Sequence, residues 1–256
     1  MINNEFRIFV DFDGTITQKD VGESIFREFG DKVKIDLIIK DLLSDKITAK
    51  QSWIEMCKTI NHANINSLNS FIDKIDVDLG LHNFVKFCES SNVEIIILSD
   101  GFDYYIDRIL KRENLSHLKY FSNHLRISDR NKLTPVFPYS DLNCRTSANN
   151  KRNHIINNSS DEDFTVYVGD GNSDKDPALY CDFIFAKKGL LKYCEKENVS
   201  FFPYNTLDDV IVKLDLILKK KNVKKRNQAN LKRREAYITE SFLKEKYFNE
   251  TIRNIF

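Results

Sequence analysis

Two short segments of this 256-residue chain each carry a pair of aspartates that could share one metal ion. Asp11 and Asp13 lie in the sequence Asp-Phe-Asp-Gly-Thr, and Asp170 and Asp174 lie in Gly-Asp-Gly-Asn-Ser-Asp. Carboxylates within about 4–6 Å of one another raise each other's pKa and resist ionisation. A divalent cation relieves most of that repulsion, and carboxylate and carbonyl oxygens suit Mg²⁺, which also keeps waters and binds phosphate. The four aspartates therefore predict a magnesium site, provided that the fold brings the two segments together.

A carboxylate beside a bound cation could also attack a phosphorus atom. Attack by Asp11 would give an aspartyl-phosphate, a recognised covalent intermediate. Asp13, two residues further on, could protonate the leaving oxygen and then deprotonate the water that hydrolyses the intermediate. The transferred group needs donors to its equatorial oxygens, and Ser99, the backbone N–H groups after it and Lys151 could supply them. These residue types predict chemistry on a phosphate ester.

A run typical of a buried strand precedes each of the three polar segments. The runs are short and rich in Val, Ile and aromatic residues, and they cover residues 6–10, 93–98 and 164–168. Further strands are expected at 183–186 and 199–202, with helices between strands, such as 103–114 and 151–157. This alternation predicts an α/β fold with a doubly wound, mainly parallel, Rossmann-like sheet. Ligands bind at the carboxyl ends of such strands, where the polar segments fall.

One connection is far too long for a single crossover helix, because 88 residues separate Asp11 from Ser99. Apolar positions in residues 18–78 recur at helical spacing, so we expect an inserted helical cap that excludes water and selects substrates. Residues 125–139 predict a β-hairpin beside the sheet. We therefore expect an α/β core of residues 1–17 and 79–215, a helical cap of residues 18–78, and a basic, helical C-terminal extension of residues 216–256.

The composition argues against a membrane-spanning protein and against one held together by disulfide bonds or zinc. Hydrophobic residues make up 41% and aromatic residues 12% of the chain, which is enough for a core, and the formal net charge is +1. No apolar run approaches the roughly 18 residues of a membrane span. The five cysteines include no C-x-x-C pair, which disfavours a zinc site and a disulfide framework and fits a reducing cytosol. We expect a cytoplasmic globular protein without a membrane span.

The C-terminal extension carries a strong local charge. Residues 219–234 hold nine Lys or Arg and no acid. Such a helix could bind RNA or an anionic membrane surface, although no recognised nucleic-acid motif supports the first alternative. Apolar residues at helical spacing beyond it, from Ile238 to Ile255, instead favour packing on the body or on a partner chain, including a second copy in a homodimer.

The polar segments, in this order, resemble the four motifs of phosphatases of the haloacid dehalogenase superfamily. Residues 11–15 resemble the first motif, Ser99 the second, Lys151 the third and residues 169–174 the fourth, and the resemblance covers residues 6–205. Four motifs in order, each on its expected element, are much more specific than one short pattern. The resemblance implies that Asp11 is the nucleophile.

The same resemblance implies the remaining roles. Asp13 is then the general acid and base, and Mg²⁺ is bound by Asp11, the Asp13 carbonyl and Asp170, with Asp174 as a further ligand or a support. The phosphoryl group is bound by a loop and a lysine: Ser99, Asp100, Gly101 and Lys151. Within that loop, the Asp100 carboxylate should point away from the phosphate and cap a helix, because its charge would repel the ligand.

A helical cap after the first motif resembles the subgroup that contains phosphoserine phosphatase and 2-hydroxy-3-keto-5-methylthiopentenyl-1-phosphate phosphatase, an enzyme of methionine salvage. Residues 98–103, Cys144 and residues 185–204 resemble the second of these branches. Asp20 occupies the position of a substrate-contacting acid in phosphoserine phosphatases, although it could equally serve the cap hinge. Those enzymes also place an arginine in the cap for the substrate carboxylate, whereas Met56 stands there in this chain.

The expected function is Mg²⁺-dependent hydrolysis of a small phosphorylated metabolite through an aspartyl-phosphate, with a substrate similar to those of methionine salvage. Three alternatives stay open at this point. They are a phosphoserine phosphatase, a phosphomutase that returns the phosphoryl group to its substrate, and a regulatory or binding protein that works through the basic C-terminal helix.

Overall fold

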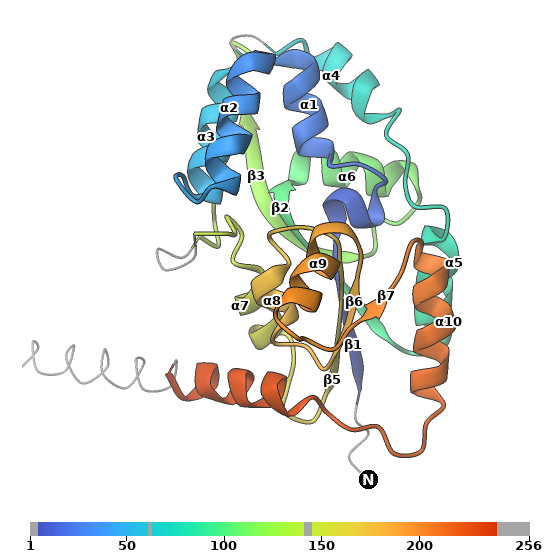
Figure 1. Ribbon diagram of the computed structural model, residues 1–256. Helices are drawn as coiled ribbons and strands as arrows, with labels where there is room; N and C mark the ends of the chain where they lie inside the picture. The colour runs from blue at the N-terminus through green and yellow to red at the C-terminus, as the bar shows by residue number, and fades with distance from the viewer. Residues whose placement is uncertain (1–4, 61–62, 141–144, 240–256) are drawn as a thin grey trace, which may run out of the picture.

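A mainly parallel sheet forms the centre of the protein, as the strand pattern predicts, and it has seven strands among the residues that the structure describes (Figure 1). The computed structural model describes residues 5–60, 63–140 and 145–239. The strands, in the spatial order β4-β3-β2-β1-β5-β6-β7, are β1 (Phe6–Asp11), β2 (Glu94–Phe102), β3 (Lys119–Ile127), β4 (Leu133–Val136), β5 (Phe164–Gly169), β6 (Phe183–Ala186) and β7 (Phe202–Pro203). The central β1 pairs in parallel with β2 and β5. This arrangement brings the ends of the three motif-bearing strands to one edge.

Helices cover both faces of the sheet because side chains alternate along the buried strands. From β1, Ile8 and Val10 enter one hydrophobic cluster, and Phe9 enters the other. The first cluster lies under α5 (Leu81–Ser90), α6 (Asp103–Arg112) and α10 (Leu207–Leu218), and the second under α7 (Lys151–Asn157), α8 (Lys175–Ala178) and α9 (Lys188–Lys196). A strand buried on both faces has no polar face, which explains the continuous apolar runs in the sequence.

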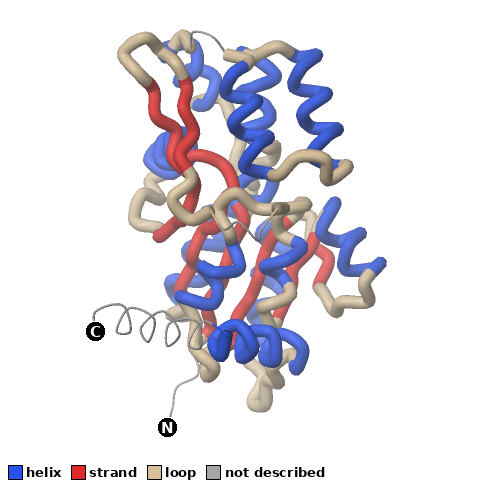
Figure 2. The backbone as a smooth tube through the Cα atoms, turned by 90° about the vertical axis from the view of Figure 1, so that its left-hand side faces the viewer, coloured by secondary structure: helices blue, strands red, loops and turns tan. Residues whose placement is uncertain are grey.

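Four helices lie above the carboxyl edge of the sheet, between the first two motifs (Figures 1 and 2). They are α1 (Val21–Phe29), α2 (Lys32–Leu43), α3 (Ala49–Lys58) and α4 (Ile65–Ile72). The two chain segments that connect them to the sheet pair with each other, since the Gln18 amide donates to the Asp76 carbonyl and the Asp78 amide to the Ile16 carbonyl. The helical character of residues 18–78 thus agrees with the expected cap, whose boundaries stay a prediction.

Two elements at the edges of the sheet test the finer strand expectations. Strands β3 and β4 pair antiparallel from His124–Val136 to Ile127–Leu133, so the predicted hairpin forms. The strand expected at 199–202 is mostly absent, because β7 begins only at Phe202. The Val199 amide instead donates to the Cys194 carbonyl and closes the end of α9, which uses residues that the pattern assigned to a strand.

The single long helix expected from residue 216 onward is wrong. Helix α10 ends at Leu218, residues 219–226 are irregular, and a second helical segment covers residues 227–239. Like charges four residues apart, Lys220 with Lys224 and Lys221 with Lys225, disfavour a continuous helix. The apolar positions from Phe242 onward, like Cys144, lie outside the described residues.

The second helical segment (227–239) packs at the end of the sheet opposite the cap (Figure 1). Arg233 is fully buried, and its guanidinium donates to the Thr165 hydroxyl at 2.8 Å and contacts Asp182 Oδ2 at 3.2 Å. Arg226 donates to the carbonyls of Ala178 and Leu179. These contacts favour docking of the extension on the body over a freely exposed basic helix.

Two features bear on the exclusions drawn from composition. Among the described residues, no helix is both long enough and apolar enough to cross a membrane. The described cysteines are buried and free of disulfide bonds, and they are Cys57, Cys88, Cys181 and Cys194. They pack as small apolar side chains.

Replacement of Arg233 by Met should lower the free energy of unfolding by about 3–5 kcal/mol, because it leaves the buried Asp182 carboxylate without its ionic partner. Urea denaturation followed by circular dichroism measures this loss. The matched control is Arg234→Met: the Arg234 side chain is 58% exposed and lies 3.4 Å from Asp161, so we expect a change below about 1 kcal/mol. Equal losses in the two variants would show that the Arg233 pair does not anchor the extension.

Candidate active site

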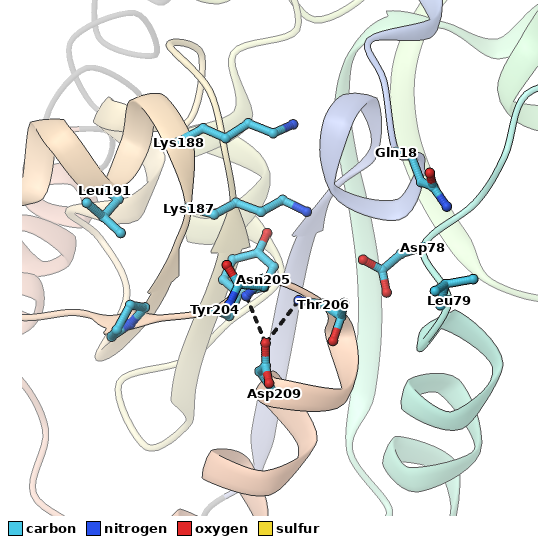
Figure 3. A pocket seen from close by; sticks show the side chains of 11 residues that line it. Gln18, Asp78, Leu79, Lys187, Lys188, Leu191, Tyr204, Asn205, Thr206 and Asp209 are labelled. Carbon is cyan, nitrogen blue, oxygen red and sulfur yellow. Dashed lines mark hydrogen bonds between the residues drawn. The ribbon is translucent and has the colours of Figure 1, made fainter.

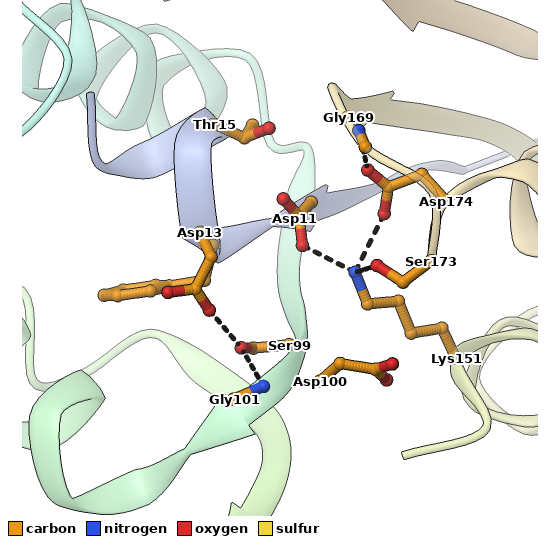
Figure 4. A network of polar contacts seen from close by, with 12 residues as sticks. Asp11, Asp13, Thr15, Ser99, Asp100, Gly101, Lys151, Gly169, Ser173 and Asp174 are labelled. Atoms are coloured by element: carbon orange, nitrogen blue, oxygen red, sulfur yellow. Dashed lines mark hydrogen bonds and ion pairs between the residues drawn. The ribbon is translucent and has the colours of Figure 1, made fainter. Parts of the chain in front are cut away.

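The carboxyl edge of the sheet brings together the aspartates of the first and fourth motifs (Figure 4). Asp11 ends β1, and the chain then makes a tight turn over Phe12–Ile16 that contains Asp13. Asp170 directly follows β5, and Asp174 precedes α8. Oxygens of Asp11, Asp170 and Asp174 lie within 4.8 Å of one another. The residues that the sequence predicts as metal ligands, apart from the Asp13 carbonyl, therefore form one buried cluster.

Burial and mutual repulsion control the protonation of this cluster. Loss of water, together with the charges of Asp174 and Asp170, raises the pKa of Asp11 well above its usual value. Burial likewise raises the pKa of Asp170. Gly14 explains how the two segments approach so closely: it has φ +83°, and a Cβ there would lie 2.5 Å from Asp170 Oδ2.

Lys151 supplies the counter-charge. Its ammonium lies 2.5 Å from Asp11 Oδ1 and 2.8 Å from Asp174 Oδ1, and it donates to Ser173 Oγ at 3.0 Å. Although burial lowers the pKa of Lys151, the charges of Asp11 and Asp174 outweigh burial and raise it above its usual value. Because the two carboxylates keep it protonated, the fully buried side chain stays a positive charge beside the expected nucleophile.

Asp174 holds the loop of the fourth motif in place. Its carboxylate accepts hydrogen bonds from the Tyr167 hydroxyl at 2.6 Å, the Asp170 amide at 3.0 Å and the Gly171 amide at 2.9 Å, in addition to the Lys151 ammonium. Burial raises its pKa, but the charge of Lys151 and these hydrogen bonds lower it below the usual value. This many donors fit a carboxylate that supports the metal site more than one that binds the metal directly.

Asp13 faces the second motif. Its Oδ2 accepts from Ser99 Oγ and from Tyr105 Oη, both at 2.9 Å, and its Oδ1 accepts from the Val21 amide at 3.0 Å. Burial raises the pKa of Asp13, while the hydrogen bonds from Tyr105 and Ser99 oppose that rise. Gly101 makes room for this contact, because a Cβ at Gly101 would lie 1.5 Å from the Tyr105 hydroxyl. Three groups therefore fix the orientation of the expected acid and base.

The second motif sits at an irregularity in β2. The pairing of β2 with β3 shifts register between Leu98 and Phe102, and such a bulge redirects the side chains in between. The Asp100 carboxylate accepts from Ser147 Oγ at 2.5 Å and from the Ala148 amide at 3.0 Å. Asp100 thus caps the loop that leads into α7. The sequence predicts that this carboxylate caps a helix. Binding of the phosphate by Asp100 stays a prediction. Only the backbone of Asp100 could make that contact, because its carboxylate is engaged by Ser147 and Ala148.

A cavity of about 360 Å³ lies between the cap helices and the carboxyl edge. Asp11, Asp13 and Asp170 line one side of it, and Asp20 lines the other. Asp20 Oδ1 accepts from the Glu23 amide at 2.7 Å and so caps α1. Although the Asp20 side chain is exposed, partial loss of water in the cavity and the nearby charge of Asp13 raise the pKa of its carboxyl group above the usual value. The two roles suggested for Asp20, hinge structure and contact with a ligand, are therefore compatible.

Sequence reasoning missed several polar residues of this site, among them Tyr105 and Lys188, which contact the predicted Asp13 and Asp170. Tyr105 resembles a core aromatic in the first turns of an amphipathic helix, and no local pattern marks it as polar. Lys188 follows β6, at the same edge as the motifs, and its ammonium lies 2.8 Å from Asp170 Oδ2. The signal that could have found Lys188 is its place after a predicted strand.

Lys188 also lines a second cavity, of about 710 Å³ (Figure 3). Lys187, Tyr204 and Asp209 line it together with Asp78 of the cap connection. The Asp209 carboxylate is occupied by the amides of Asn205 and Thr206. None of the predicted catalytic residues lines this cavity, so the smaller one is the candidate active site.

Comparisons with known proteins show that the chain is similar to phosphatases. The model of a family described as Putative Phosphatase matches residues 6–200. The chain is 25% identical over 218 residues to 2-hydroxy-3-keto-5-methylthiopentenyl-1-phosphate phosphatase of Bacillus cereus (strain B4264), covering 84% of this chain and 98% of that protein. It is 27% identical over 224 residues to a polyol phosphate phosphatase of Saccharomyces cerevisiae, covering 82% of this chain and 93% of that protein.

Among solved structures, a phosphoserine phosphatase with a phospho-aspartyl intermediate analogue aligns with a TM-score of 0.64. Sequence identity is 20%, and the alignment covers 83% of this chain and 99% of that chain. At this identity the likeness concerns the fold alone. It confirms the predicted α/β architecture with a mainly parallel sheet.

Replacement of Tyr105 by Phe should raise the pKa of the Asp13 carboxyl group further, because the lost hydroxyl hydrogen bond stabilises the charged form. A pH titration of the carboxyl carbon of Asp13 by NMR measures the shift in metal-free protein. Tyr104→Phe is the matched control, since the Tyr104 hydroxyl donates to Asn69 at 2.6 Å instead. An unchanged Asp13 titration in the Tyr105 variant would contradict the assigned hydrogen bond.

Proposed function

Because this chain belongs to the putative phosphatase family and is an enzyme of the phosphatase class, we propose that it hydrolyses a small phosphomonoester with Mg²⁺ through an aspartyl-phosphate. One observation carries the proposal: carboxylate oxygens of Asp11, Asp170 and Asp174 lie within 4.8 Å of one another beside a cavity. Such a buried cluster of acids is unfavourable unless cations neutralise it.

The donor set at this cluster fits magnesium. It consists of oxygen atoms only, which suits a hard cation that also keeps waters and binds phosphate. The Lys188 ammonium lies 2.8 Å from Asp170 Oδ2, so a cationic group already contacts one of the expected metal ligands. Asp11, the Asp13 carbonyl and Asp170 would hold the ion, with Asp174 supporting them. When bound, Mg²⁺ neutralises charge on the phosphoryl oxygens and on the cluster.

The first half of the proposed reaction transfers the phosphoryl group to Asp11. A carboxylate oxygen of Asp11 forms a bond to phosphorus, and the bond from phosphorus to the substrate's alcohol oxygen breaks. Asp13 donates its proton to that oxygen, so the leaving group departs as a neutral alcohol. Burial raises the pKa of Asp13, which favours the protonated form that this step needs.

The second half releases inorganic phosphate. Asp13, now ionised, takes a proton from a water molecule whose oxygen bonds to phosphorus, while the bond to Asp11 breaks and restores its carboxylate. Ser99 Oγ and the backbone amides after it would donate to the phosphoryl oxygens, and Lys151 adds a fixed positive charge beside Asp11. The net reaction consumes one phosphate ester and one water.

Replacement of Asp11 by Asn should lower kcat by about 10³-fold or more, because the amide cannot act as the nucleophile. Release of inorganic phosphate from p-nitrophenyl phosphate measures the rate, and circular dichroism checks the fold. Asp36→Asn is the matched control, since the Asp36 side chain is 64% exposed and pairs with Arg27 in the cap. Full activity in the Asp11 variant would rule out nucleophilic attack by Asp11.

Removal of divalent cations should abolish turnover, and Mg²⁺ should restore it, because the acid cluster binds phosphate only when it is neutralised. The measurement is phosphate release after dialysis against chelator, with and without added Mg²⁺. Phosphate should appear without any bisphosphorylated activator, which separates hydrolysis from mutase chemistry. Undiminished turnover in excess chelator would contradict the metal, and a strict need for a bisphosphate would favour the mutase.

A further inference from the structure

The cap side of the active-site cavity is mostly apolar. Side chains from α2 and α3 form this wall, and they are Ile39, Leu42, Leu43, Ala49, Ser52, Trp53 and Met56. The opposite side holds the aspartates and the second motif. A substrate whose phosphate lies at the aspartates would therefore direct the rest of the molecule, its alcohol part, toward an apolar surface.

Positive charge is confined to the phosphate end of the cavity. Among the described residues that line it, Lys188 is the only basic one, and its ammonium is held by Asp170 and the Gly14 carbonyl. Arg27 of α1 lies four residues after Glu23, but it cannot serve as a counter-charge for a substrate. Its guanidinium already donates to Glu23 and, at 2.7 Å, to Asp36. The wall thus offers no counter-charge to an anionic group on the alcohol part.

The two acids on the cap side are already satisfied. Glu23 accepts from Arg27 Nε at 2.6 Å, and Asp20 accepts from the Glu23 amide at 2.7 Å. Neither carboxylate therefore requires a cation from the substrate, and the charge of Glu23 would repel a further anion. Free oxygens on them can accept hydrogen bonds from substrate hydroxyl groups.

The apolar wall is also firmly packed. The Trp53 ring lies 5.0 Å from the Phe102 ring and 5.9 Å from the Phe26 ring, measured between centroids. A Cβ at Gly22 would lie 2.5 Å from Trp53, so glycine lets the indole ring approach α1. Trp53, held in this way, cannot easily move aside to admit the water that a carboxylate beside it would need.

We propose that the active site selects phosphomonoesters of uncharged, hydroxylated alcohols and rejects those whose alcohol part carries a carboxylate. This inference rests on the proposed function and narrows its substrate class. The cost of placing an unpaired carboxylate against an apolar wall that offers no counter-charge carries the discrimination. Phosphoserine, which has such a carboxylate, is thereby a poor substrate.

Glycerol 3-phosphate and 3-phosphoglycerate test the proposal, because they differ only by a hydroxymethyl group in place of a carboxylate. With the full chain and Mg²⁺, kcat/KM should be at least about 100-fold higher for glycerol 3-phosphate. Equal values would overturn the proposal. Faster turnover of phosphoethanolamine than of glycerol 3-phosphate would also overturn it, by showing that the acids select a cation.

Leu43→Arg tests the cause of the selection. Leu43 lines the cavity and is 67% exposed, so the substitution should not disturb the fold. A new guanidinium there should lower the preference for glycerol 3-phosphate about fivefold, the value of an exposed ion pair. Leu43→Gln, the uncharged control, should keep the preference, and an unchanged preference in Leu43→Arg would overturn the charge argument.

A non-selective substrate separates this inference from the proposed function. If p-nitrophenyl phosphate is hydrolysed with Mg²⁺ but the two glycerol derivatives are turned over equally, only the inference about selectivity fails. If p-nitrophenyl phosphate, glycerol 3-phosphate and 3-phosphoglycerate all remain intact, the proposed hydrolysis itself fails.

Discussion

The ion pairs of Lys151 with Asp11 and Asp174 are the constraint on which the site depends. Three carboxylates within 4.8 Å of one another would not stay ionised in a buried position on their own. The fully buried Lys151 ammonium contacts two of them and thereby offsets part of their repulsion. The strands bring the carboxylates to one edge of the sheet. Lys151, the first residue of α7, then offsets the repulsion between them.

The cap is tied to the chemistry through its first helix. Asp13 Oδ1 accepts from the Val21 amide, which belongs to the first turn of α1, and Asp20 caps the same helix. A helix N-terminus favours negative charge, so α1 helps Asp13 to ionise, while burial opposes it. Any movement of α1 away from the sheet would break the hydrogen bond to Asp13. Cap position and the proton affinity of the expected acid and base are therefore linked.

The sequence predicted the site better than its surroundings. The motifs and the strands before them were visible because buried parallel strands are continuous apolar runs and the chemistry follows their ends. Tyr105 and Lys188 were not, since each reaches the site from an element with no motif of its own. The break after Leu218 was missed because helical spacing in the sequence does not show that Arg233 must turn back to reach Asp182.

The two buried networks of cations and carboxylates act on the same part of the chain. At the active-site end, Lys151 and Asp174 hold the end of β5 and the start of α8. At the opposite end, Arg233 binds Thr165 near the start of β5, and Arg226 donates to the carbonyls of Ala178, the last residue of α8, and of Leu179, which follows it. The C-terminal extension therefore contacts the strand and the helix that flank the fourth motif, at the ends away from that motif. A helix of four residues has few hydrogen bonds of its own, so these contacts add to the ones that hold α8 beside β5.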